Sequence, residues 1–200
     1  MAAVTTEVGV ANLALQRVGA KTITAFDDGD RNADTVNLVY EDVRDEVQRT
    51  FPWACLTGRT ELSTSAASNS SFAYTHTLAA TVWRVLDING DEATKFRVEG
   101  TTLYTDEQTG YFRAVIQSST VTAWDPLLIT AIETRLASKI AYKLTQDIQL
   151  SAAMFQEYLL MLGMAIRLAA IEYHEDNEKI LQMMQDMSPA ALLKKDYVSE

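Results

Sequence analysis

The spacing of apolar residues changes twice along this chain, and this change restricts the possible folds more than any other feature of the sequence. Near both ends, apolar residues repeat at helical intervals of three and four, whereas residues 59–123 show no sustained period of this kind. The middle segment is instead rich in Thr and Ser, with aromatic and β-branched residues in short runs, a composition typical of strands. The sequence therefore predicts an α+β fold, in which an antiparallel bundle of about four helices carries an inserted small antiparallel β domain.

Two helices are predicted before the β segment. The first follows the capping candidates Thr5 and Thr6, ends at Gly19, and has apolar residues at helical spacing: Val8, Ala11, Leu15 and Val18. A turn over residues 27–30 leads to the second helix, which Pro52 stops. Its apolar stripe lies opposite an acidic face and consists of Ala33, Val36, Tyr40, Val43 and Val47.

The strongest strand of the middle segment is Val82–Ile88. It runs into Asn89 and Gly90, which tolerate the positive φ of tight turns, so we predict a hairpin to a second strand around residues 95–98. Further features are expected on both sides: a small-residue loop at 63–71, a turn at 99–100, and strands at 103–104 and 111–117.

Two more helices are predicted after the β segment. Asp125 is a good N-cap and Pro126 suits the first helical position, and the core stripe that follows is Ile129, Ile132, Leu136, Ile140 and Leu144. From Ser151 the chain is apolar nearly all round. We therefore expect the fourth helix to be the central one of the bundle, or to be buried by a neighbouring subunit.

The 200 residues suit one globular domain with a modest insert, because a chain of this length can bury a self-sufficient core. We predict a discontinuous helical domain over 1–58 and 124–177, a β insert over 59–123, and a C-terminal extension over 178–200. The extension is either a docking arm or a frayed terminus.

The chain is acidic, with 27 acidic and 17 basic residues and a formal net charge of −10. Phosphate recognition depends on clustered Lys and Arg, so specific binding of nucleic acid is not expected. Between residues 27 and 49, eight acids face three arginines. We interpret this segment either as a solvated helix face or as an acidic wall, in a ring, that DNA passes without adhering. The candidates for such a channel lining are Asp27, Asp28, Asp30 and Asp34, and the alternative is that the loops of the β insert face the channel.

No catalytic signature is present. The sequence lacks a Gly-rich phosphate loop, a GxSxG elbow, an HExxH motif and a CxxC motif. A possible calcium loop from Asp28 has Ala33 in place of the turning glycine and Val39 in place of the bidentate Glu. Cys55 is the single cysteine, and the two histidines lie too far apart to suggest a metal cluster. We therefore nominate no catalytic, cofactor-binding or metal-ligating residue, and expect a protein that is not an enzyme.

No stretch of the sequence predicts contact with a membrane or export. No apolar run reaches the roughly 18 residues that a membrane span needs. The first ten residues contain neither a basic patch nor an apolar core of a signal peptide, so intracellular synthesis is expected.

A set of spaced motifs identifies a family that this chain resembles. In order they are Ala14, Leu15, Val18, Gly19, Ala20, Ile23, Asp27, Asp28, Tyr40, Arg44, Asp45, Pro52, Trp53 and Ala54, and later Trp124, Asp125 and Pro126. This order is similar to that of the tail tubular protein A family, the head-to-tail adaptors of short-tailed bacteriophages. The resemblance spans residues 5–175. It departs from the family at 79–81, where the family usually has Pro, and beyond Asn177.

The resemblance implies a structural virion protein, made in the host cytoplasm and located in the tail or neck of the particle. Its partners would be other copies in a dodecameric ring, the portal protein, and a tail nozzle protein similar to tail tubular protein B. The ring would close the head after packaging and line the ejection channel, through which DNA passes without specific binding.

Most family-motif residues are expected to build the fold. Pro52 and Trp53 would form a helix stop and an aromatic plug with Tyr40 beneath, and Arg44 with Asp45 a salt bridge or subunit contact. The alternative function is an oligomeric helical regulatory or protein-interaction module without a virion role, and a third hypothesis is a hydrolase with an unrecognised site. Ring stoichiometry separates the adaptor from both.

Overall fold

The computed structural model describes residues 4–63, 66–67, 71–91 and 93–172 of the chain. These residues form two compact units, one made of residues 4–47 and 125–172 and the other of residues 48–124. The sequence analysis placed the ends of the insert at 59 and 123; the second unit begins earlier, at Gln48. The predicted extension over 178–200 lies outside the described residues. None of the described helices is long and apolar enough to cross a membrane.

The first unit is built from four α-helices: α1 (Glu7–Arg17), α2 (Arg31–Thr50, whose last three residues belong to the second unit), α3 (Pro126–Thr145) and α4 (Ile148–Glu172). The predicted caps are confirmed. The Thr6 hydroxyl accepts a hydrogen bond from Gly9 N (3.1 Å), the Asp125 carboxylate accepts one from Leu127 N (2.7 Å), and Gly19 follows α1 with a φ of +70°. Polar side chains thus fix the starts of α1 and α3.

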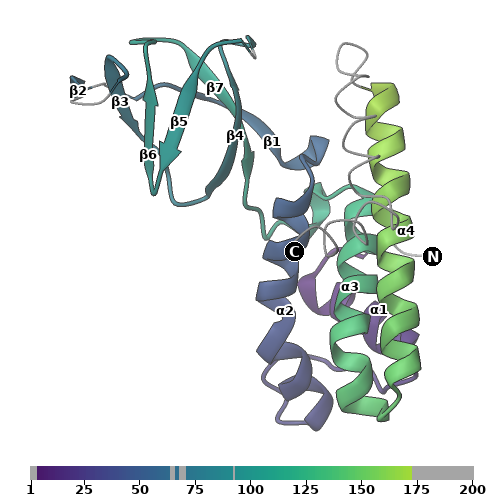
Figure 1. Cartoon of the computed structure of the whole chain (residues 1–200). Coiled ribbons are helices and arrows are strands. Elements are labelled where there is room, and N and C mark those ends of the chain that lie inside the picture. The colour runs from purple at the N-terminus through teal and green to yellow at the C-terminus, as the bar shows by residue number, and fades with distance from the viewer. Residues whose placement is uncertain (1–3, 64–65, 68–70, 92, 173–200) are drawn as a thin grey trace, which may run out of the picture. The chain divides into compact units, whose positions relative to one another are not determined.

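Helix α3 is the central helix of this unit. Figure 1 shows it between α2 and α4, and α1 also packs against it. Its buried residues cover most of its circumference: Leu128, Ala131, Ile132, Leu136, Ala137, Ile140 and Ala141. On α2 the predicted stripe of Ala33, Val36, Tyr40, Val43 and Val47 is buried. The predicted stripe is therefore confirmed for α2. On α3 it was right for Ile132, Leu136 and Ile140, whereas Ile129 and Leu144 are only partly buried, and other residues of α3 are buried in addition.

The expectation that the fourth helix is central to the bundle was wrong. The buried residues of α4 are Tyr158, Leu162, Ala165 and Ile166, while several of its large apolar side chains are exposed. The physical reason is that α3 already occupies the centre, so α4 contacts the unit along only one face. The other expectation for this helix, burial by a neighbouring subunit, stays a prediction.

The second unit contains two antiparallel sheets. One has the order β1-β7-β4, with β1 (Thr57–Glu61), β7 (Tyr111–Ile116) and β4 (Val82–Ile88). The other has the order β2-β3-β6-β5, with β2 (Ala66–Ala67), β3 (Tyr74–Thr77), β6 (Thr102–Thr105) and β5 (Phe96–Glu99). Short 3-10 helices, Ala54–Leu56 and Val121–Ala123, flank the strands. Together with the helices, these sheets confirm the predicted α+β class.

A small apolar core fills this unit. It consists of Leu78, Val85, Ile88, Leu103, Phe112 and Ala114. Residues 48–56 also belong to the unit, and one contact that holds them there is the amide of Gln48. This amide donates to Ser118 O (2.7 Å) and accepts from Ser118 N (3.1 Å). The end of α2 is thereby tied to the segment that follows β7.

The predicted hairpin between residues 82–88 and 95–98 was wrong, although the turn itself is present. Asn89 and Gly90 have φ values of +57° and +74°. However, β4 pairs with β7, and β5 pairs with β6. After the turn, the Asp91 carboxylate accepts a hydrogen bond from Ala93 N (2.8 Å) and so starts a second turn. The chain therefore leaves β4 before it can form a second ladder.

The other strand predictions are confirmed for the described residues. Strands β5 and β6 form a hairpin around Gly100, which has a φ of +58°. The strand predicted at 111–117 is β7. Within the predicted loop at 63–71, residues 66–67 form the short strand β2, and residues 64–65 and 68–70 lie outside the described residues.

Candidate functional site

The family-motif residues at the start of the chain are structural in their surroundings. Ala14 and Leu15 are fully buried on α1. Ala20 N donates to Leu15 O (2.9 Å) and Gly19 N to Gln16 O (3.0 Å), so these residues close the helix end. Asp125 and Pro126 likewise form the N-terminal cap of α3. Ala14 and Leu15 therefore belong to the core, while Gly19, Ala20, Asp125 and Pro126 define helix ends.

Tyr40 lies in the core of the first unit. Its ring packs against Phe26, with centroids 4.9 Å apart, and its hydroxyl is buried with no hydrogen-bond partner among the described residues. Burial raises the pKa of the Tyr40 hydroxyl, Glu7 adds to this, and Arg44 opposes it. These contacts make Tyr40 part of the core of the first unit.

Arg44 of α2 contacts two carboxylates, Glu7 on α1 and Asp45 on its own helix. Its Nε donates to Asp45 Oδ1 (2.7 Å) and its Nη1 to Glu7 Oε1 (2.9 Å). Burial lowers the pKa of the Arg44 guanidinium, but the hydrogen bonds and charges of Asp45 and Glu7 outweigh this and hold the pKa above its ordinary value. The predicted ion pair of Arg44 with Asp45 is present, but it lies within α2 and not at a helix end. The contact that joins two helices is the pair of Arg44 with Glu7 of α1, which the sequence did not predict.

Pro52 and Trp53 lie in the second unit, directly after α2. Trp53 is buried, and its ring meets the ring of Phe51 edge-on, with centroids 5.3 Å apart and planes at 87°. The predicted helix stop is confirmed, because α2 ends at Thr50. The sequence analysis also expected Tyr40 beneath this plug; the ring partner observed for Tyr40 is Phe26.

The four acids nominated as a channel lining lie at the turn before α2 and in its first turn. Asp27, Asp28, Asp30 and Asp34 are all exposed. Asp28 organises the turn, because its carboxylate accepts hydrogen bonds from Thr24 N (2.7 Å), the Thr24 hydroxyl (2.8 Å) and Ala25 N (3.1 Å). These bonds lower the pKa of the Asp28 carboxyl. The segment therefore presents concentrated negative charge on a fixed turn.

An exposed apolar strip runs along α4. Leu160, Met164 and Leu168 follow one another at intervals of four residues, so they share one face of the helix, and they are 68%, 47% and 46% exposed. We call these three residues the outer strip. Ile148 (71% exposed) and Phe155 (37%) add apolar surface nearer the helix start. In the sequence of this helix, apolar residues occur nearly all round and exceed what one buried face can hold. The sequence does not show which of these residues stay exposed.

Residues 155–158 of α4, one turn before the strip, are held by contacts with arginines. Arg135 of α3 lies over the rings of Phe155 (5.0 Å) and Tyr158 (5.7 Å) and also pairs with Glu46 of α2 (2.7 Å). Arg17 of α1 pairs with both Glu133 and Glu157. The helix that bears the outer strip is thus fixed to its neighbours and offers a preformed surface.

The described residues contain no group of three or more His, Cys, Asp and Glu side chains placed to hold a metal ion. In comparisons with known proteins, no family model and no curated protein matches the chain.

Proposed function

We propose that this protein is a head-to-tail adaptor of a short-tailed bacteriophage, a structural virion protein that forms an oligomeric ring between the portal and the tail nozzle. The observation that carries the proposal is the outer strip of α4. Large apolar side chains exposed along one face of a fixed helix favour burial against another protein surface. A ring of identical subunits would provide that surface on every copy.

The distribution of charge also supports this proposal. The exposed acids at 27–34 suit a channel wall, because like charge keeps DNA from adhering to it. In this proposal the protein has no enzymatic activity and no cofactor. It closes the packaged head, seats the nozzle and lines the ejection channel.

Mass determination and negative-stain electron microscopy of the purified chain, alone and mixed with a candidate portal ring, test the proposal. We expect rings, or a stable ring-sized addition to the portal. A monomer or dimer that ignores portals would contradict the adaptor function and favour the regulatory or protein-interaction module.

A matched pair of variants tests whether the outer strip forms the subunit contact. Leu160 on α4 and Leu38 on α2 are 68% and 70% exposed, so L160K and L38K introduce the same charge at equally exposed sites. We expect L160K to abolish assembly at concentrations where L38K assembles like the parent chain. Equal loss in both would show that surface charge, and not the strip, controls assembly.

A further inference from the structure

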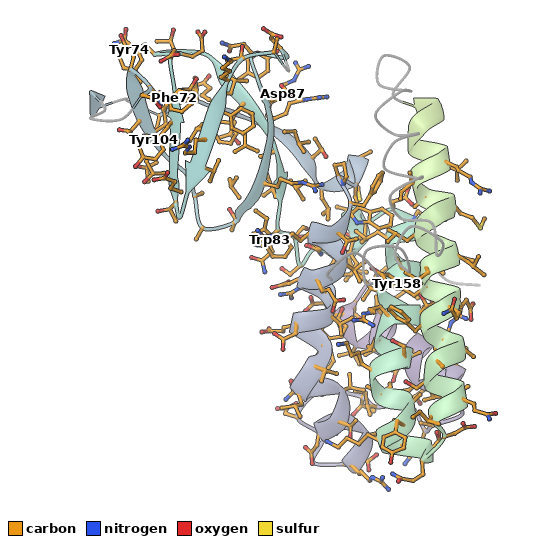
Figure 2. All side chains as sticks on the ribbon, viewed as in Figure 1. Phe72, Tyr74, Trp83, Asp87, Tyr104 and Tyr158 are labelled. Carbon is orange, nitrogen blue, oxygen red and sulfur yellow. The ribbon has the colours of Figure 1, made fainter. Side chains whose placement is uncertain are left out.

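A pocket of the second unit contains two arginines that have no acidic partner in the part of the chain that the structure describes. The pocket has a volume of about 540 Å³. Its apolar walls include Trp83, Phe96 and Val98, and its two cations are Arg49, in the last turn of α2, and Arg84 of β4. Figure 2 labels Trp83 on the ribbon of β4. Cavities of this size commonly hold one ligand or a few side chains of a partner.

Arg84 is held in the pocket at an energetic cost. Its Nε and Nη2 are buried and have no hydrogen-bond partner among the described residues. Burial lowers the pKa of the Arg84 guanidinium, and the nearby positive charge of Arg49 lowers it further. A desolvated cation next to a like charge is unfavourable unless an anion completes the site.

The other eight arginines have different surroundings. Five of them contact a carboxylate: Arg17, Arg44, Arg97, Arg113 and Arg135. Of the remaining three, Arg31 donates to Lys143 O (2.8 Å), Arg59 lies over the ring of Tyr111 (5.1 Å), and Arg167 is exposed. Among the described residues, Arg49 and Arg84 form no such ion pair, although the chain carries 27 acids. The missing anion is therefore best supplied from outside the unit.

The surroundings of the two arginines indicate the kind of anion. Apolar and aromatic side chains line the pocket together with the two arginines, and this mixed lining suits a carboxylate carried next to an apolar side chain. The chain as a whole is strongly negative, which opposes a nucleic-acid ligand. A guanidinium donates two parallel hydrogen bonds to one carboxylate, so Arg84 is suited to a single carboxylate side chain.

The position of the pocket indicates that the ligand is a polypeptide segment. Six of its nine lining residues belong to β4, the last strand of one sheet, and β5, the last strand of the other. Edge strands leave backbone N–H and C=O groups free for the main chain of an added segment. We infer that this pocket binds a protein segment that carries an Asp or Glu beside an apolar residue, with its carboxylate between Arg49 and Arg84. Binding here requires neither a ring nor a portal.

Selection from a randomised short-peptide display library on the full-length chain, with the R84Q variant as counter-selection, tests this site. We expect peptides enriched in Asp or Glu next to apolar or aromatic residues. The consensus peptide should bind at least about tenfold more tightly to the parent chain than to R84Q or R49Q. Replacing its acid by the amide should cause a similar loss. Calorimetric titration measures both.

The control variant is R97Q, which alters an exposed arginine of the same unit, and it should bind the peptide like the parent chain. Circular dichroism verifies that all variants are folded. Two results would overturn the site. One is a selection in which peptides that prefer the parent chain over R84Q are not enriched in Asp or Glu. The other is that R97Q weakens peptide binding as much as R84Q does. Full displacement of the peptide by millimolar inorganic phosphate would also overturn it, in favour of a phosphate ligand. A consensus that matches residues 26–34 would identify a second copy of the chain as the partner, and any other consensus a different protein.

Discussion

At the residue scale, the polar groups buried in the first unit differ in how well they are satisfied. Arg44 has two carboxylate partners, whereas the hydroxyl of Tyr40 has none among the described residues. Both positions belong to the family motif, so the sequence alone gave them equal weight. The structure separates them, because an ion pair between helices stabilises the unit and an unsatisfied buried hydroxyl does not.

Replacing Arg44 should destabilise the first unit. The Arg44 side chain is 8% exposed, and its loss leaves Glu7 and Asp45 without their shared cation. Because both carboxylates keep some contact with water, we expect R44A to lower the free energy of unfolding by about 1–3 kcal/mol. Urea unfolding followed by circular dichroism measures this. The exposed pair of Arg97 and Glu99 is the control, and R97A should change stability by less than about 0.5 kcal/mol.

Removing the Tyr40 hydroxyl should leave stability unchanged or increase it by up to about 1 kcal/mol, since this group is buried without a partner. The effect should also depend on pH. Because burial raises the pKa of Tyr40 in the folded state, the unfolded chain ionises first, above about pH 10, and stability falls as the pH rises further. Y40F lacks this group, so its advantage should grow above pH 10. A stability loss of more than about 1 kcal/mol at neutral pH would mean that the hydroxyl has a partner that the structure does not reveal.

At the element scale, local signals predicted the helices and most strands well. Thr6, Asp125 and Pro126 set helix starts through contacts within three residues, and apolar stripes set the buried faces of the helices. Both signals lie within a short stretch of sequence, so the helices can be predicted without knowledge of distant contacts. Strand pairing depends on distant partners. The pairing of β4 with β7 and the central position of α3 arise from contacts across the fold, and the sequence misassigned both. The meeting of Arg49 and Arg84 is likewise long-range and had no local signal.

Two glycines with positive φ should differ in their tolerance of a side chain. At Gly19 (φ +70°) an added Cβ would meet nothing within 4 Å, so G19A should cost about 1 kcal/mol from backbone strain alone. At Gly110 (φ +130°) the Cβ would lie 2.0 Å from Asn89 Oδ1, which accepts a hydrogen bond from Tyr111 N. We expect G110A to cost at least about 2 kcal/mol, because strain adds to the loss of this contact between β4 and β7. Denaturant unfolding measures both costs. If G19A and G110A lower the free energy of unfolding by the same amount, the Asn89 side chain can move away from the added Cβ without loss of stability.

At the scale of the whole molecule, the distribution of charge and apolar surface connects the structure to the proposed ring. Acids at 27–34 and the outer strip lie on different elements of the first unit, so one can face a channel while the other is buried between subunits. The sequence analysis found the acids but could not decide whether they form a solvated face or a channel wall. Both interpretations require exposed acids, which is what the structure shows. Only a measurement of DNA passage through the assembled ring can therefore distinguish them.

Reversing the four acids at the turn should slow DNA ejection from reconstituted particles if they line the channel. Changing Asp27, Asp28, Asp30 and Asp34 to Lys adds two charges at each position and moves the net charge from −10 to −2. DNA would then adhere to a basic wall, most strongly at low salt. A control with the same net charge reverses four exposed acids outside the 27–49 segment: Glu61, Asp91, Glu99 and Asp106. Ejection timed by dye fluorescence should be slowed in the first variant and near normal in the control. Equal slowing would assign the effect to bulk charge, and unchanged ejection in both would leave the turn as an ordinary solvated surface.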